Sequence, residues 1–154
     1  MNMAKPSFQS VMDMPMSDIP VPKPVPTGEY LAMTIGQAVD GEASTGTKFK
    51  TITFQLLEAL DSVNRDELKA ALEKPDGTVM PLRDKTLSTR LYITDNAARR
   101  NADFLIALGV DPKMSITEAF GNIAGRQAYI AVRHTPSRTG PGVFAEISEV
   151  SAVG

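Results

Sequence analysis

Apolar and polar residues alternate in five stretches of the chain, and this period of two predicts half-buried β-strands. The stretches cover residues 29–37, 48–57, 86–93, 127–133 and 143–150. In the second stretch Ile52, Phe54 and Leu56 share one face and are expected in the core, with Phe49 on the outer face. In the third stretch the expected inward set is Leu87, Thr89, Leu91 and Ile93, and the outward set is Ser88, Arg90 and Tyr92.

The last two stretches flank a segment rich in Pro, Gly, Ser and Thr at residues 134–142, which predicts a β-hairpin with a long tip. Each strand of this hairpin has one apolar face. The apolar set is Ala128, Ile130, Val132, Val143, Ala145 and Ile147, and the outward set includes Tyr129, Arg133 and Phe144. The outer face of the hairpin therefore combines aromatic rings with guanidinium groups.

Helix signals lie between the third and fourth strands. Thr94 or Asp95 is expected to cap a helix that ends near residue 108, before Gly109. Its expected apolar stripe is Ala98, Ala102, Leu105 and Ile106. Residues 115–118 have the capping-box pattern of a further short helix. Residues 40–47 are expected to form a loop, and residues 61–76 an acidic, solvated insertion with a helix at 65–73.

The order strand, strand, strand, helix, strand, strand predicts a mainly β fold with helical insertions. It is typical of the OB-fold, a five-stranded Greek-key barrel with a helix between strands 3 and 4, although a split barrel or a small sandwich has similar signals. The barrel is expected at residues 27–150. Residues 1–26 hold six of the eleven prolines and five of the eight methionines and are expected to form an arm outside it, with a short tail at 151–154.

Composition narrows the chemistry. The 154 residues include no cysteine and one histidine, which excludes disulfides and thiolate metal sites and leaves no His-based metal cluster. Nucleotide-binding, protease and hydrolase motifs are absent from the sequence, so we expect no enzymatic activity, no cofactor and no metal. We find no signal peptide and no stretch apolar enough to cross a membrane, and therefore expect a cytoplasmic protein with no membrane partner.

Charge is distributed unevenly along the chain. The net charge is −2, yet residues 43–57, 85–93 and 119–145 together carry seven basic and no acidic side chains. Basic and aromatic side chains on one surface can neutralise phosphates and stack on bases. The candidate nucleic-acid-binding residues are Lys48, Phe49, Lys50, Arg90, Tyr92, Tyr129, Arg133, Arg138 and Phe144. The alternative interpretation of the hairpin is a solvated sheet edge that arginines keep soluble.

Residues 26–150 resemble the small OB-fold single-stranded-DNA-binding proteins of tailed bacteriophages. The resemblance rests on Pro-Thr-Gly-Glu-Tyr at 26–30, the strand at 48–57, Ile-Ala-Leu-Gly at 106–109, and Ile-Ala-Gly-Arg at 123–126 before a Tyr-Ile-Ala-Val strand. It implies binding of single-stranded DNA in phage replication or recombination, in the host cytoplasm. Several such proteins end in an acidic tail that recruits partners, whereas this chain ends Glu-Val-Ser-Ala-Val-Gly.

The proline-rich arm favours a second hypothesis. A phage structural or accessory protein could use residues 1–26 to grip a protein partner, or the arm could mediate self-association. The sequence therefore predicts a DNA-binding module first and an interaction protein as the alternative.

Overall fold

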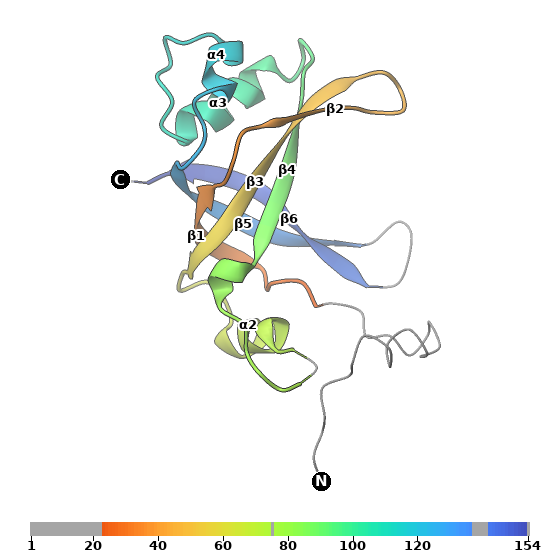
Figure 1. Ribbon diagram of the computed structural model, residues 1–154, viewed down its shortest axis with the longest axis vertical. Helices are drawn as coiled ribbons and strands as arrows, with labels where there is room; N and C mark the ends of the chain where they lie inside the picture. Colours follow the sequence, from red (N-terminus) through yellow and green to blue (C-terminus); the bar gives the residue numbers. More distant parts are fainter. Residues whose placement is uncertain (1–22, 75, 137–141, 154) are drawn as a thin grey trace.

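The computed structural model describes residues 23–74, 76–136 and 142–153 (Figure 1). The protein is mainly β, with an open antiparallel sheet of six strands. The strands are β1 (Gly28–Thr34), β2 (Val39–Glu42), β3 (Lys48–Ala59), β4 (Thr86–Tyr92), β5 (Gln127–Pro136) and β6 (Val143–Ala152). The helices are α2 (Arg65–Leu72), the 3-10 turn η2 (Leu82–Asp84), α3 (Ala98–Ala107) and α4 (Ile116–Phe120).

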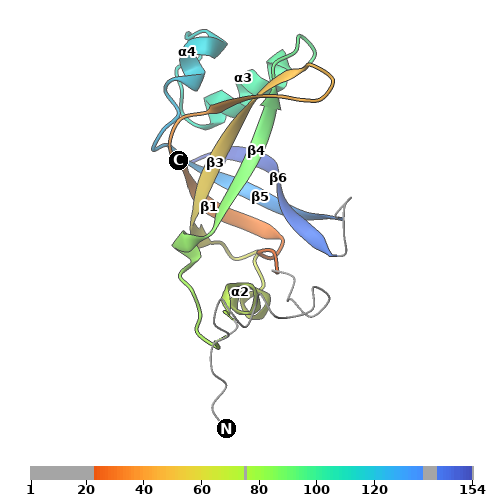
Figure 2. The ribbon, with the colours of Figure 1, turned by 45° about the vertical axis from the view of Figure 1, so that its right-hand side comes forward.

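The register of β3 defines the arrangement of the sheet. β1 pairs with residues 54–59 of β3 and β2 with residues 48–51, while β4 pairs with residues 49–55. β1 and β2 therefore follow one another along one edge of β3, and β4 occupies the other edge. β5 pairs with β1, and β6 with β5, so that β4 and β6 lie at the two ends of the sheet. Figure 2 shows β3 and β4 as one long pair that β5 and β6 cross at a large angle.

β4 and β6 contact each other, but within the described part of the chain no ladder joins them. The sheet is thus open, with six strands rather than the expected five. The additional strand is β2, which lies partly within the segment expected to be a loop. The turn is confined to residues 43–47, where the Ala43 N–H donates to the Thr47 carbonyl oxygen at 2.8 Å. Pairing with β3 outweighs the weak strand propensity of Asp40 and Gly41, which is why the loop prediction was wrong there.

The core confirms most of the expected inward faces. Ile52, Phe54 and Leu56 are buried on β3, and Leu91 is buried on β4. Ala128, Ile130, Val132 and Ile147 are buried on the hairpin. Ile93 was expected inward but is 45 % exposed, because β4 ends at Tyr92 and the alternation ends with it.

The first strand buries Tyr30, Ala32 and Thr34. The Tyr30 hydroxyl donates to the Pro26 carbonyl oxygen at 2.7 Å, and burial raises the pKa of this phenol far above its usual value. Val25 and Pro26 are themselves buried. The packed unit therefore includes the last residues of the expected arm, whereas residues 1–22 lie outside the described residues.

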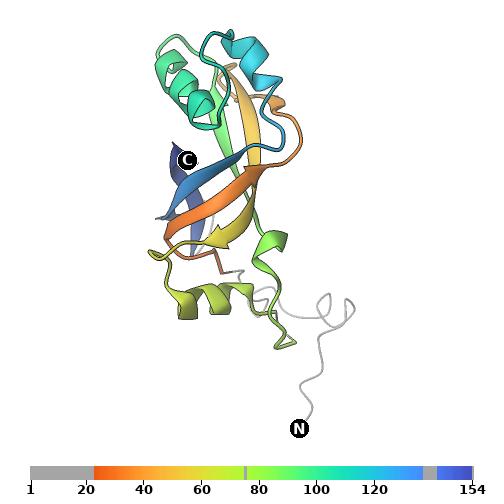
Figure 3. The ribbon, with the colours of Figure 1, turned by 90° about the vertical axis from the view of Figure 1, so that its left-hand side faces the viewer.

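The helices lie at the two ends of the sheet, with α2 at one end and α3 and α4 at the other (Figure 3). Asn64 caps α2 by accepting from the Glu67 N–H at 3.0 Å. The composition of the segment around α2 had indicated a solvated insertion. The segment is only partly solvated, because Val63, Ala71 and Leu72 are buried. Of these, Val63 belongs to the hydrophobic core of the sheet. No helix among the described residues is long and apolar enough to span a membrane.

Helix α3 begins later than expected, and its predicted apolar stripe is confirmed at Leu105 but not at Ile106. Thr94 Oγ1 accepts from the Ala97 N–H at 3.2 Å and forms a turn before the helix. Asn101 and Leu105 are buried, whereas Ile106, expected in the apolar stripe, is 40 % exposed. Asn101 is drawn inward because its amide donates to the Tyr92 carbonyl oxygen at 2.8 Å, which ties α3 to the end of β4. The predicted cap of α4 is confirmed, with Ser115 Oγ accepting from the Glu118 N–H at 3.2 Å.

Candidate nucleic-acid interface

Three of the predicted site residues meet on the outer face of β3 and β4. Phe49 and Tyr92 are register partners, and their ring centroids are 5.7 Å apart at an interplanar angle of 65°. The guanidinium carbon of Arg90 lies 4.4 Å from the Phe49 ring centroid, in cation–π contact. Phe49 is buried to 9 % exposure beneath these neighbours, while Tyr92 keeps 42 % exposure. We call Phe49, Arg90 and Tyr92 the aromatic plate.

Gly41 on β2 leaves room for the Phe49 ring of this plate. It is the register partner of Phe49, and a Cβ atom at this position would lie 2.5 Å from Phe49 Cζ. The ring therefore lies across the bare backbone of β2, which only glycine permits. Phe49 is consequently not free to stack on a ligand and instead supports Arg90 and Tyr92.

Lys50 lies on the other face of β3, as its inward parity had indicated. Its ammonium contacts Asp40 Oδ1 at 2.5 Å and lies 5.7 Å from the Phe120 ring centroid. Lys48 has the same parity and is exposed. Neither lysine therefore shares the face of the aromatic plate, and the charge of Lys50 is already paired.

The hairpin residues form a separate group. Arg133 Nε contacts Glu146 Oε2 at 3.3 Å, and Thr135 Oγ1 donates to the same oxygen at 2.5 Å. The bond from Thr135 and then the bond from Arg133 lower the pKa of Glu146. Phe144, the register partner of Thr135, is 47 % exposed. Tyr129 is half-buried, and its register partner, Ser151, lies near the far end of β6. Arg138 lies outside the described residues.

One arginine in the basic stretch at residues 119–145 has a structural role. Arg126 Nη1 donates to the Gly109 carbonyl oxygen at 2.9 Å, and its Nε donates to the Asn122 carbonyl oxygen at 2.5 Å. It thereby joins the ends of α3 and α4, and these two bonds hold its guanidinium in place. Within the described residues Lys48, Lys85 and Arg90 have no carboxylate in ion-pair contact.

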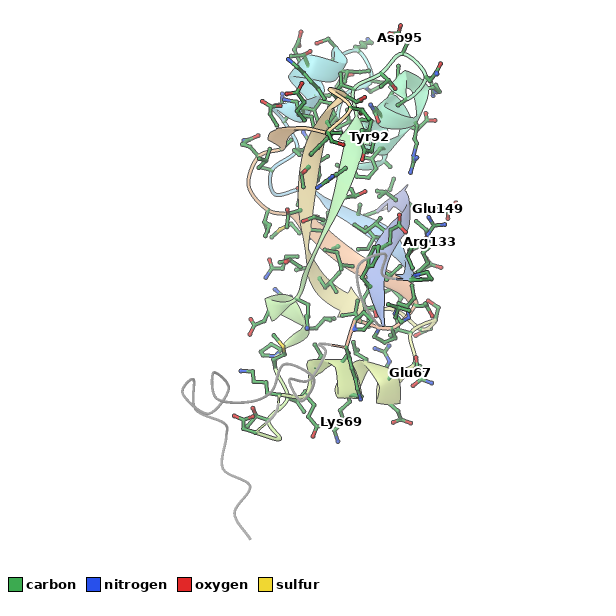
Figure 4. The ribbon with its side chains drawn as sticks, turned by 90° about the vertical axis from the view of Figure 1, so that its right-hand side faces the viewer. Glu67, Lys69, Tyr92, Asp95, Arg133 and Glu149 are labelled. Carbon is green, nitrogen blue, oxygen red and sulfur yellow. The ribbon has the colours of Figure 1, made fainter. Side chains whose placement is uncertain are left out.

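A cleft that sequence analysis did not reveal separates β4 from β6. Its volume is about 350 Å³. Its lining residues are Thr89, Leu91, Arg100, Asp103, Phe104, Ile147, Ser148, Glu149 and Val150. β4 and α3 form it together with β6, which lies far along the chain from both, so no local pattern could have indicated it. Figure 4 looks onto this side of the molecule, with Tyr92 on β4 above Glu149 and Arg133 on the hairpin.

Comparison with known proteins gives no family. No protein-family model matches this chain, and no curated protein matches its sequence. The geometry of the described residues is therefore the basis for any assignment of function.

Proposed function

We propose that this protein binds single-stranded DNA with little sequence preference, by stacking bases on side chains and neutralising phosphates. The observation that carries the proposal is the aromatic plate: the Arg90 guanidinium lies over the Phe49 ring, and the exposed ring of Tyr92 contacts the same ring. Planar guanidinium groups and aromatic rings both stack on unpaired bases, whatever the base identity. Arg90 has no carboxylate partner within the described residues and can also meet a phosphate.

The connectivity of the strands supports an OB-type barrel as the finer fold class. β1 and β2 act as a single interrupted first strand along β3, and the remaining order of pairing is β4-β3-β1-β5-β6. Helix α3 follows the third long strand, β4. In OB-folds the second and third strands carry the ligand, and the first–second and fourth–fifth loops flank it. Here those strands are β3 and β4, which bear the aromatic plate.

The biological role that follows is protection of exposed single strands during phage DNA replication or recombination, in the host cytoplasm. Self-association through residues 1–26 would then place neighbouring copies along one strand. The burial of Val25 supports this role, because it anchors the end of the arm to the DNA-binding unit. An accessory protein that grips a protein partner through the same arm is the alternative.

Titration of a fluorescent single-stranded oligonucleotide across salt concentrations tests the proposal. We expect log affinity to fall linearly with log salt and a matched duplex to bind more weakly. Equal affinity for single strand and duplex, or no binding of either at low salt, would overturn it. In the second case, capture of a protein by the full chain but not by a chain lacking residues 1–22 would favour the alternative.

A further inference from the structure

The cleft between β4 and β6 has the properties of a ligand site. Its volume of about 350 Å³ falls within the range of roughly 300–1,000 Å³ that is usual for small-molecule pockets. Leu91, Phe104 and Ile147 provide an apolar wall. Thr89, Ser148 and Glu149 provide hydroxyl and carboxylate groups around it. An apolar wall with a few polar groups suits a flat heteroaromatic ring.

The two strands that border the cleft each leave one edge unpaired in the described sheet. An unpaired edge presents backbone N–H and C=O groups in alternation. Such a row can meet the donors and acceptors of any base edge, so its hydrogen bonding is tolerant of sequence.

A β-bulge lies at the same place. Ala131 pairs with Glu149 and Val132 with Ile147, which leaves Ser148 as the additional residue on β6. Its hydroxyl donates to the Ala131 carbonyl oxygen at 3.2 Å. Bulges interrupt a ladder and redirect side chains, and they are frequent beside binding sites. Ser148 is exposed and lines the cleft.

The charges around the cleft favour one orientation of a bound nucleotide. Asp103 and Glu149 line the cleft, and their carboxylates would repel a phosphate. Each base has at least one N–H group that can donate a hydrogen bond to a carboxylate. Arg100 also lines the cleft, whereas Arg90 lies on the opposite face of β4 from Thr89 and Leu91. A base directed inward with its phosphate outward satisfies both signs of charge.

We infer that the β4–β6 cleft holds an unpaired nucleobase of the bound DNA, on the opposite face of β4 from the base stacked on Tyr92, so that the DNA passes over the unpaired edge of β4. The inference rests on the proposed function and adds a site to it. It also predicts discrimination against duplex, because a paired base cannot enter a cleft without leaving its stack. Recognition of a single strand would then depend on this cleft as well as on the aromatic plate.

The absence of cysteine from the chain permits a direct test. Ser148→Cys places a thiol at the cleft. Ser62→Cys places a control thiol shortly before α2, where the Ser62 hydroxyl accepts a hydrogen bond from the Glu29 N–H. Alkylation rates of both variants are measured alone, with a mixed-sequence single strand and with the matched duplex. In parallel, Ser148→Phe fills the cleft, and its affinity for the single strand is compared with that of the unmodified chain.

We expect the single strand to slow alkylation at position 148 by about tenfold or more and to leave position 62 unchanged, with no protection by duplex. Ser148→Phe should lose at least about tenfold in single-strand affinity, the scale of one base contact, while its thermal midpoint stays near that of the unmodified chain. If the unmodified chain binds the strand but position 148 reacts at the same rate with and without it, the cleft inference is wrong and the proposed function stands. If the unmodified chain binds no strand at low salt, the proposed function itself fails. Should Ser148→Phe unfold, the alkylation rates alone decide.

Discussion

The Arg90 guanidinium and the Phe49 ring form a cation–π pair on neighbouring strands, with 4.4 Å between the guanidinium carbon and the ring centroid. This contact restricts the rotamers of the Arg90 side chain before any ligand binds. A pre-ordered guanidinium loses less entropy on binding than a mobile one. Phe49 is therefore a positioning residue for Arg90 and for Tyr92, which contacts the same ring at its edge.

Replacement of Tyr92 by alanine should weaken single-strand binding by roughly 1–3 kcal/mol, since the exposed ring is the base-stacking member of the plate. The slope of log affinity against log salt should hardly change, because no charge is removed. Salt-dependent oligonucleotide titrations measure both quantities. The chain has no tryptophan, so DNA should also quench tyrosine fluorescence, and this quenching should be largely lost in the variant.

Tyr129→Ala is the matched comparison for that experiment. Tyr129 is half-buried, and the register places it on β5 rather than on the strand of the aromatic plate. A loss of affinity as large as that of Tyr92→Ala would show that the bound DNA also contacts the outer face of the hairpin. Unfolding of the Tyr92 variant would contradict its exposed position.

Gly41→Ala should destabilise the fold and weaken DNA binding together. The added Cβ atom would meet the Phe49 ring, whose Cζ lies 2.5 Å from that position, so the ring and Arg90 must shift. A double-mutant cycle with Phe49→Ala measures the effect, because the clash disappears when the ring is removed. We expect a coupling energy of about 0.5–3 kcal/mol in urea unfolding, with the double variant less destabilised than the sum of the two singles. Strictly additive losses would mean that Phe49 does not rest on Gly41.

The alternation of apolar residues was sufficient to predict the long strands and most of the core. Ile52, Phe54 and Ile130 are buried on the predicted faces because a half-buried strand has a fixed period of two. Helix boundaries and the loop at residues 40–47 were less predictable. Asp40 and Gly41 are poor strand formers, and only their partners on β3, Lys50 and Phe49, explain why they pair.

The candidate site was predictable only in its parts. The charge count over residues 43–57 and 119–145 left out Asp40 and Glu146, which lie just outside these stretches. The two carboxylates pair with Lys50 and Arg133 across neighbouring strands. The same counting could not recognise that Arg126 holds helix ends together. Parity placed Arg90 and Tyr92 correctly outward, but the cleft on the other face of β4 depends on the approach of β4 to β6, which no local pattern contains.

Replacement of Glu146 by glutamine should strengthen single-strand binding at low salt. Arg133 would lose its carboxylate partner and become available to a phosphate, which steepens the salt slope by roughly 0.7. Glu58→Gln, which removes an exposed carboxylate from β3 that has no ion pair within the described residues, controls for the change in net charge. Identical slopes for the two variants would show that Arg133 does not contact DNA.

The same carboxylate should contribute to the dependence of stability on pH. Hydrogen bonds from Thr135 and Arg133 lower the pKa of Glu146 in the folded state, so folding favours its ionised form. The stabilisation is present above the ordinary glutamate pKa of about 4.3 and is lost as the pH falls through the lower folded value. Urea unfolding of the unmodified chain and of Glu146→Gln, measured between neutral pH and acid, should give curves that converge at low pH. A difference that persists unchanged into acid would contradict this origin.

Tyr30→Phe should cost about 0.5–1.5 kcal/mol of stability, because it removes the buried hydrogen bond to the Pro26 carbonyl oxygen. Tyr129→Phe is the matched control, since no hydrogen bond of its hydroxyl is present within the described residues and little change is expected. Both variants keep the aromatic ring, so packing is preserved and urea midpoints compare the hydroxyl groups alone. Equal midpoints for the two would mean that the bond to Pro26 contributes nothing measurable.

Two truncations separate the arm from the packed unit. Removal of residues 1–22 should leave the thermal midpoint nearly unchanged, because Val25 is the first buried side chain among the described residues. Removal of residues 1–26 should lower it clearly, since it deletes the buried Val25 side chain, the acceptor of the Tyr30 hydroxyl and the Val25 carbonyl oxygen that lies 2.7 Å from His134 Nε2. Loss of a buried valine alone is expected to cost roughly 1.5–3 kcal/mol. If the shorter truncation also changes oligomerisation by light scattering, or the cooperativity of DNA coating, then residues 1–22 act between molecules. Equal melting of both truncations would instead place the start of the stable unit at Thr27.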